Sequence, residues 1–136
     1  MKNRVVVTAI IEKDDKILMG KKAGNVGPYP NTWHLIGGGI NLGEESAMEA
    51  IKREIQEETG LKVNEIERVG FDEDFEADKQ GEMTHYIFLI YKTMITNEDA
   101  LAGDDIVTLE WIDKSKLKEL SLTRPSTKYF KELGLI

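Results

Sequence analysis

Three glutamates, Glu54, Glu57 and Glu58, fall within five consecutive positions of the chain. On an α-helix, positions i, i+3 and i+4 lie on one face, so like charges there repel by roughly 0.2–0.5 kcal/mol per pair. Carboxylate oxygens are also the ligands that a hard cation such as Mg²⁺ prefers, and a bound cation would offset the repulsion. The spacing is compatible with a divalent-metal site along one side of a helix, but taken alone the three glutamates favour an ordinary helix held by surface ion pairs.

The helix that would carry these glutamates is predicted over residues 46–59. Ser46 followed by Glu49 matches a capping box, and Gly60 suits the left-handed position just after the last helical turn. A helical wheel puts Arg53 on the solvated side. It puts the three glutamates at the edge of the core-facing stripe, which is formed by Ala47, Met48, Ile51 and Ile55. Carboxylates at the edge of a core are poorly hydrated, and this position favours a bound cation.

A solvated helix held by ion pairs is the alternative, because pairs such as Arg53 and Glu57 have i, i+4 spacing. The surrounding residues favour the metal site. Gly39, Glu45 and the run from Arg53 to Leu61 form one spaced pattern over 23 residues. An ordinary charged helix gives no reason for a pattern of that length.

Residues 39–61 resemble the signature box of the Nudix (MutT-like) hydrolases, with every defining position present. The similarity extends along the chain. Around residues 86–91, 110–113 and 131–136 it is greatest for small nucleoside triphosphatases that prefer pyrimidine deoxynucleotides. The resemblance implies Mg²⁺-dependent hydrolysis of a nucleoside diphosphate linked to a group X, with Mn²⁺ as a substitute ion. The favoured reaction converts a nucleoside triphosphate to monophosphate and pyrophosphate. The alternatives are cleavage of ADP-ribose or a nucleotide sugar, and non-catalytic nucleotide sensing.

The resemblance also assigns roles near the box. Glu54, Glu57 and Glu58 become carboxylate ligands of the metal and candidate catalytic residues, and Gly38 becomes a backbone-carbonyl ligand. One of the glutamates, or an acid from a loop, would accept the proton of the attacking water. Ile36 precedes the glycines where many family members have a proline, so the shape of this turn is expected to differ.

Four further residues of the box are predicted to be structural: Gly39, Glu45, Arg53 and Gly60. Glu45 and Arg53 would tie the loop before the helix to the helix itself by a charge-assisted pair.

A further catalytic acid is predicted at Asp105, six residues before Trp111, because the family often supplies one from the loop before the last strand. The acids that compete for this role are Glu98, Asp99 and Asp104.

Three residues outside the box are predicted to contact the substrate. Lys22 ends a predicted strand near the expected phosphates, and strand alternation allows only one of Lys21 and Lys22 to face inward. Tyr29, in a loop rich in glycine and proline, and Trp33 are candidates to stack on a base, Tyr29 being the better of the two, but core packing is the favoured role for both. A structural role is predicted for the two histidines, His34 and His85.

The pattern of the whole chain predicts one α+β domain over residues 1–136. Strands are expected at 4–12, 16–22, 32–36, 66–77, 83–96 and 106–112, and short helices at 113–120 and 125–133. This mixture of elements predicts a mixed β-sheet sandwiched between α-helices. The resemblance identifies that arrangement as the Nudix fold.

Composition limits the partners. The 136 residues carry a formal net charge of −7, which argues against non-specific binding to nucleic acid or an anionic membrane. No cysteine is present, so disulfides, thiolate metal sites and a cysteine nucleophile are excluded. No apolar stretch approaches the ~18 residues of a membrane-spanning helix. We expect a cytoplasmic protein whose partner is a small-molecule nucleotide, with no nucleic-acid or membrane partner. The sequence does not decide between a monomer and a homodimer.

Overall fold

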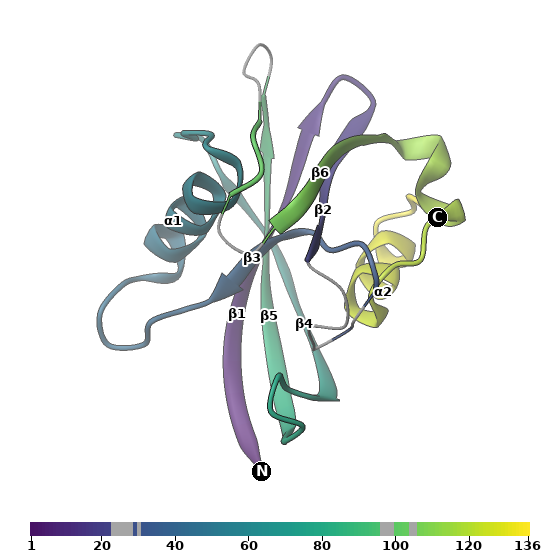
Figure 1. Ribbon diagram of the computed structural model, residues 1–136. Helices are drawn as coiled ribbons and strands as arrows, with labels where there is room; N and C mark the ends of the chain where they lie inside the picture. The colour runs from purple at the N-terminus through teal and green to yellow at the C-terminus, as the bar shows by residue number, and fades with distance from the viewer. Residues whose placement is uncertain (23–28, 30, 96–99, 104–105) are drawn as a thin grey trace.

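A mixed β-sheet lies between two helices, α1 (Ala47–Thr59) on one face and α2 (Arg124–Glu132) on the other (Figure 1). The computed structural model describes residues 1–22, 29, 31–95, 100–103 and 106–136. The strands are β1 (Lys2–Lys13), β2 (Lys16–Lys22), β3 (Ile36–Gly39), β4 (Glu67–Ala77), β5 (Met83–Met94) and β6 (Ile106–Asp113). The predicted α+β class, with a mixed sheet between helices, is confirmed.

The long strand β1 is the centre of the sheet, whose order is β4-β5-β1-β2-β6. One edge of β1 pairs in parallel with β5 from Lys2 to Glu12. The other edge changes partner along its length, pairing antiparallel with β3 from Val6 to Ala9 and with β2 at Glu12 and Lys13. The glycine-containing strand β3 is therefore fixed against the middle of β1.

Each face of the sheet has its own hydrophobic core. Successive side chains of a strand point to opposite faces, so residues 7, 9 and 11 of β1 join the core beneath α1, whereas Ile10 joins the core beneath α2. The helices add Ala50, Ile51 and Ile55 from α1, and Tyr129 and Phe130 from α2. Since full burial of one such large apolar side chain contributes about 1.5–3 kcal/mol, the first core fixes α1 against the sheet.

The strand predicted over residues 32–36 is wrong. The strand here is β3, which includes the glycine run, while Trp33 and His34 form only isolated bridges, with Leu122 and Gly20. The reason is steric, because a Cβ at Gly37 would overlap the carbonyl oxygen of Val7. The glycine run therefore allows the backbone to pair closely with β1 as a strand. A search for β-branched residues does not detect such a strand, because glycine has no side chain.

The helical segments differ from expectation in one place. The short helix predicted over residues 113–120 is a 3₁₀-helix, η1 (Lys114–Glu119), whereas α2 matches the prediction to within a residue. Among the described residues, every helix is too short or too polar to cross a bilayer.

Candidate active site

The helix α1 begins and ends at the residues that the sequence predicts. The hydroxyl of Ser46 accepts a hydrogen bond from the Glu49 backbone N–H, and the Glu49 carboxylate accepts one from the Ser46 N–H, at 3.1 and 2.9 Å. At the other end Gly60 has a φ of 74° and donates to the Gln56 carbonyl. Both caps satisfy terminal backbone groups, so they fix which residues of α1 face the sheet.

The three glutamates of α1 occupy two different environments. Glu54 and Glu58 are buried, with 7% and 3% of their surface exposed, whereas the side chain of Glu57 is 46% exposed. Glu58 Oε1 accepts a hydrogen bond from the Gly37 N–H at 2.9 Å. The structure therefore brings Glu54 and Glu58 to the glycine strand and leaves Glu57 at the rim. Within the described part of the chain, no three His, Asp or Glu side chains converge on one point.

The backbone at Gly38 lies directly against the carboxylate of Glu54. A Cβ built on Gly38 would be 2.6 Å from Glu54 Cδ and 2.6–2.7 Å from the two carboxylate oxygens. Two buried carboxylates beside a glycine backbone form a donor set made only of oxygen, which suits Mg²⁺. The residues present therefore fit a divalent cation held by Glu54, Glu58 and the backbone of Gly38.

Arg53 is the centre of an ion-pair network and not a solvated residue as the helical wheel predicts. Its Nε and Nη2 donate to the two carboxylate oxygens of Glu45 at 2.9 and 2.7 Å. Its Nη1 donates to Glu54 at 2.8 Å and to Glu57 at 3.1 Å, and Nη2 also reaches the Gly39 carbonyl at 3.3 Å. The guanidinium thus joins the loop, the glycine strand and two of the glutamates.

This pairing changes the titration of Glu45. The hydrogen bonds from Arg53, and then one from the Asn41 N–H, lower the pKa of Glu45 to about 2. A group whose pKa is lower in the folded state stabilises the fold above its unfolded pKa, and loses that effect as the pH falls toward the folded value.

We therefore expect Glu45→Gln to be less stable than the wild type at neutral pH, with a difference that shrinks between about pH 4.5 and 2. Urea unfolding at a series of pH values measures this difference. A gap between the two proteins that stays constant down to pH 2 would contradict the assignment.

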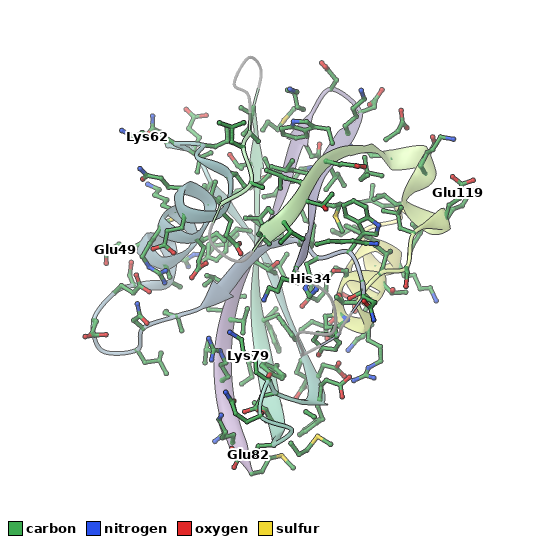
Figure 2. The ribbon with its side chains drawn as sticks, in the orientation of Figure 1. His34, Glu49, Lys62, Lys79, Glu82 and Glu119 are labelled. Atoms are coloured by element: carbon green, nitrogen blue, oxygen red, sulfur yellow. The ribbon has the colours of Figure 1, made fainter. Side chains whose placement is uncertain are left out.

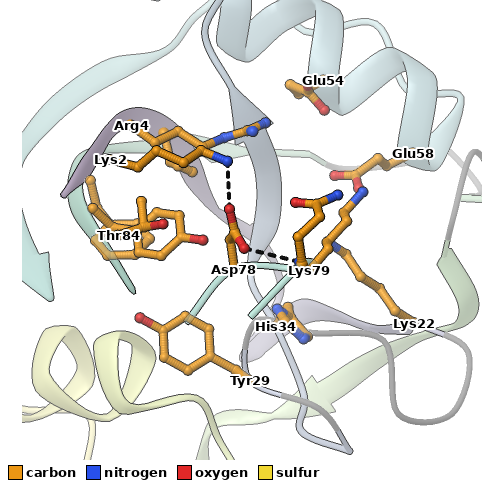
Figure 3. A pocket seen from close by; sticks show the side chains of 14 residues that line it. Lys2, Arg4, Lys22, Tyr29, His34, Glu54, Glu58, Asp78, Lys79 and Thr84 are labelled. Atoms are coloured by element: carbon orange, nitrogen blue, oxygen red, sulfur yellow. Dashed lines mark hydrogen bonds and ion pairs between the residues drawn. The ribbon is translucent and has the colours of Figure 1, made fainter. Parts of the chain in front are cut away.

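Glu54 and Glu58 lie at one side of a pocket of about 380 Å³, and Tyr29 lies at the opposite side (Figure 3). The other charged residues of its lining are Lys2, Arg4, Lys22, Asp78 and Lys79. Tyr86, Phe88 and His34 also line the pocket. Carboxylates and cationic side chains that line one cavity are the arrangement that a metal-bound polyanion requires.

Tyr29 is held in the wall of this pocket by one residue of β4 and one residue of α2. Its hydroxyl donates to Asp74 Oδ2 at 2.6 Å, and the Arg124 guanidinium lies 5.6 Å from its ring centroid. Arg124 also donates to the same Asp74 oxygen at 2.9 Å. Burial and the neighbouring carboxylate of Asp74 raise the pKa of Tyr29, so its hydroxyl stays protonated at neutral pH.

Two of the three predicted substrate contacts line the pocket. Lys22 and Tyr29 are in its lining, and Trp33 is not. Trp33 packs against the core beneath α2, and Lys21 Nζ lies 5.0 Å from its ring centroid. His34, for which the sequence predicts a structural role, lines the pocket and lies near the centre of the molecule in Figure 2, whereas Glu49 is on the outer side of α1.

The predicted loop acid Asp105 and its competitors Glu98, Asp99 and Asp104 lie outside the described residues. Residues 100–103, between Asp99 and Asp104, are fixed to the end of α1. The N–H groups of Leu101 and Gly103 donate to the carbonyls of Thr59 and Glu58, each at 3.0 Å. The chain that leads to Asp105 is therefore attached to the helical turn that carries Glu58.

Sequence reasoning missed the cations and aromatic residues that complete the pocket. Lys2 and Arg4 are separated on β1 by Asn3 alone, a signal that they share a face, but nothing local shows which face lines a site. Tyr86 comes beside Arg4 through the parallel β1–β5 register, and the turn after β4 brings Lys79. These contacts join parts of the chain about 75–82 residues apart, beyond the range of local patterns.

Comparison with known proteins identifies the family of the chain. The NUDIX domain family matches residues 1–133. Nucleoside triphosphatase NudI from Enterobacter sp. (strain 638) is 30% identical over 142 aligned positions that cover all of both chains.

Solved structures show the same fold. The MutT NUDIX hydrolase of Burkholderia pseudomallei is 23% identical, with a TM-score of 0.81 over 96% of this chain and 98% of its own. The NUDIX domain of Shewanella oneidensis NrtR, crystallised with ADP ribose, is 16% identical, with a TM-score of 0.80 over 98% of this chain and 87% of its own. Family match, full-length relative and fold together show that the chain belongs to the Nudix family and is a Nudix hydrolase.

Proposed function

We propose that the protein is a Mg²⁺-dependent pyrophosphohydrolase that converts a nucleoside triphosphate to its monophosphate and pyrophosphate. The observation that carries this proposal is the charge arrangement of one pocket. Two buried carboxylates lie at the glycine strand, Glu54 against the Gly38 backbone and Glu58 at the Gly37 N–H, and cationic side chains line the same cavity. A nucleotide polyphosphate needs both kinds of group, a metal site for the reacting phosphate and cations for the rest of its charge.

The residues of the glycine strand and α1 would hold the ion. Glu54, Glu58 and the Gly38 carbonyl are the proposed ligands, joined by Glu57 from the rim. When bound there, a divalent cation would make a coordinated water more acidic and would neutralise charge on the phosphates. One of the glutamates, or Asp105, accepts the water's proton. Water adds to a phosphorus atom and one bridging P–O bond breaks, so the two products together contain the atoms of the triphosphate and the water.

Pyrimidine deoxynucleotides, dUTP, dTTP and dCTP, are the proposed substrates. A full-length relative carries the name nucleoside triphosphatase, and Tyr29, Tyr86 and Phe88 give the pocket aromatic walls for a base. Shape alone discriminates between related bases by about 1–3 kcal/mol, or 10–200-fold. We therefore expect a preference among bases and not exclusivity. ADP-ribose is the second candidate, because a neighbour in fold was crystallised with it.

The test is pyrophosphate release from the eight common NTPs and dNTPs, beside products from ADP-ribose and GDP-mannose, under one Mg²⁺ condition. We expect a pyrimidine dNTP to have the highest kcat/KM, and activity to disappear in excess EDTA and return with Mg²⁺ or Mn²⁺. Full turnover of metal-free protein would contradict the metal site. A lead of more than tenfold for ADP-ribose or a nucleotide sugar would contradict the triphosphatase assignment.

The same assay separates the enzyme from a nucleotide sensor. The box retains all three glutamates and Arg53, which a non-catalytic domain has no need to keep. Binding of nucleotides without any hydrolysis would favour the sensor. We also infer a cytoplasmic location, where free nucleotides are available. Size-exclusion chromatography at several protein concentrations tests whether the protein is a monomer or a homodimer.

A further inference from the structure

Arg4, near the start of β1, lies close to the glycine strand β3, which borders the proposed metal site. A Cβ built on Gly39 would overlap the Arg4 guanidinium, so the guanidinium lies directly on the backbone of that glycine. Gly39 follows Gly38, whose backbone contacts the carboxylate of Glu54. Arg4 lines the cavity (Figure 3), while Arg53 donates to the carbonyl of Gly39 at 3.3 Å.

Arg4 and Lys79 are the pocket cations that form no ion pair with any of the described residues, and of these two only Arg4 presents a guanidinium. Lys2, next to it on the same face, is paired with Asp78 at 2.5 Å and approaches Glu82 at 3.6 Å. Arg4 forms no hydrogen bond or ion pair with any of the described residues. Acidic residues outnumber basic ones by 25 to 18 in the whole chain, so this lack of a partner does not come from a shortage of acids.

The chemistry of the guanidinium points to its ligand. Arginine presents five N–H donors in a planar fork that matches a phosphate group with two parallel hydrogen bonds. The reacting phosphate is expected at Glu54 and Glu58, and the base at the aromatic wall around Tyr29. Arg4, beside the glutamates but away from Tyr29 (Figure 3), is placed to meet the end of the polyphosphate chain.

We propose that Arg4 binds the terminal phosphate of the substrate and thereby selects nucleoside triphosphates over diphosphates. This inference rests on the proposed function, since it takes the substrate to be a nucleotide polyphosphate. Arg4 is a specificity residue in this scheme and takes no part in proton transfer.

The kinetic test compares Arg4→Met with the wild type on the tri- and diphosphate of the preferred nucleoside. Methionine keeps an unbranched apolar stem and removes the charge. We expect kcat/KM for the triphosphate to fall by about 10–100-fold, mostly through KM, as for the loss of a hydrogen-bonded charge. For the diphosphate we expect less than about a threefold change, because the group that Arg4 binds is absent.

Two further variants control this comparison. Arg68→Met removes an exposed arginine of β4 that lies outside the pocket lining, and it should leave both values unchanged. Arg4→Lys keeps the charge but loses the fork, so it should recover only part of the triphosphate activity. An equal loss on both substrates, or no loss on either, would overturn the assignment of Arg4.

A binding measurement decides the role of Arg4 independently of turnover. Calorimetric titration with inorganic pyrophosphate in the presence of Mg²⁺ should give a Kd at least tenfold weaker for Arg4→Met than for the wild type and for Arg68→Met. Equal affinity in all three proteins overturns the proposal. If ADP-ribose is the best substrate, the triphosphatase function fails, while the pyrophosphate titration still supports or overturns the phosphate-binding role of Arg4.

Discussion

Glu58→Gln is expected to lower kcat by roughly 10²–10⁴-fold, the range found when a group that acts on the reacting water is lost, without loss of folding stability. The carboxylate is 3% exposed and accepts a hydrogen bond from the Gly37 N–H. Glutamine has an oxygen that can keep this hydrogen bond, but it lacks the charge that binds a cation. Removing a buried charge in the metal-free protein leaves stability unchanged or slightly higher.

The measurements for Glu58→Gln are kcat at saturating Mg²⁺, Mg²⁺ affinity by calorimetry, and unfolding in urea. Glu119→Gln is the matched control, because Glu119 is an exposed glutamate of η1 far from α1 in Figure 2. It should match the wild type in all three measurements. Near-normal kcat for Glu58→Gln would show that Glu58 is not a metal ligand.

Gly38→Ala is expected to lower kcat/KM by more than about 100-fold, the cost of misplacing a reacting group by about 1 Å, while the fold stays intact. The new methyl group would be 2.6 Å from Glu54 Cδ, which is too close for two carbon atoms that are not bonded to each other. The Glu54 carboxylate has to move away, and with it the hydrogen bond from Arg53. Because the atoms that move belong to a side chain and not to the strand, the effect falls on the site.

Gly70→Ala is the control for this substitution. Gly70 lies in β4, and a Cβ there would have no atom within 4 Å. Activity and melting temperature should both stay at the wild-type values. A Gly38→Ala protein with normal activity would show that the close contact between Gly38 and Glu54 has no role in the reaction.

The helix of the box could be predicted almost completely from the sequence, because its signals are local. Ser46, Glu49 and Gly60 each act within four residues of the helix end that they fix. The charge-assisted pair of Glu45 and Arg53 also followed from the family pattern, and the structure shows it as a bidentate contact.

The pocket could not be predicted in the same way, because it is built from distant segments. Arg4 and Tyr86 are neighbours only through the parallel pairing of β1 with β5, and no periodicity in either strand encodes that pairing. The position of Trp33 shows a second limit. An aromatic residue in a loop next to a site has the same sequence signature whether it faces a ligand or, as here, packs against the core.

The double pairing of β1 has a consequence for how the molecule opens. Amide protons of the residues between Val6 and Ala9 belong to a strand with a neighbour on each edge, β5 and β3, whereas β4 has a described partner on one edge alone. In native-state hydrogen exchange, β1 and β5 should exchange last, through global unfolding, and β4 earlier, through partial opening. The glycine strand pairs with β1 at these same residues, so the metal-binding backbone should belong to the slowest-exchanging unit and not to a fluctuating loop.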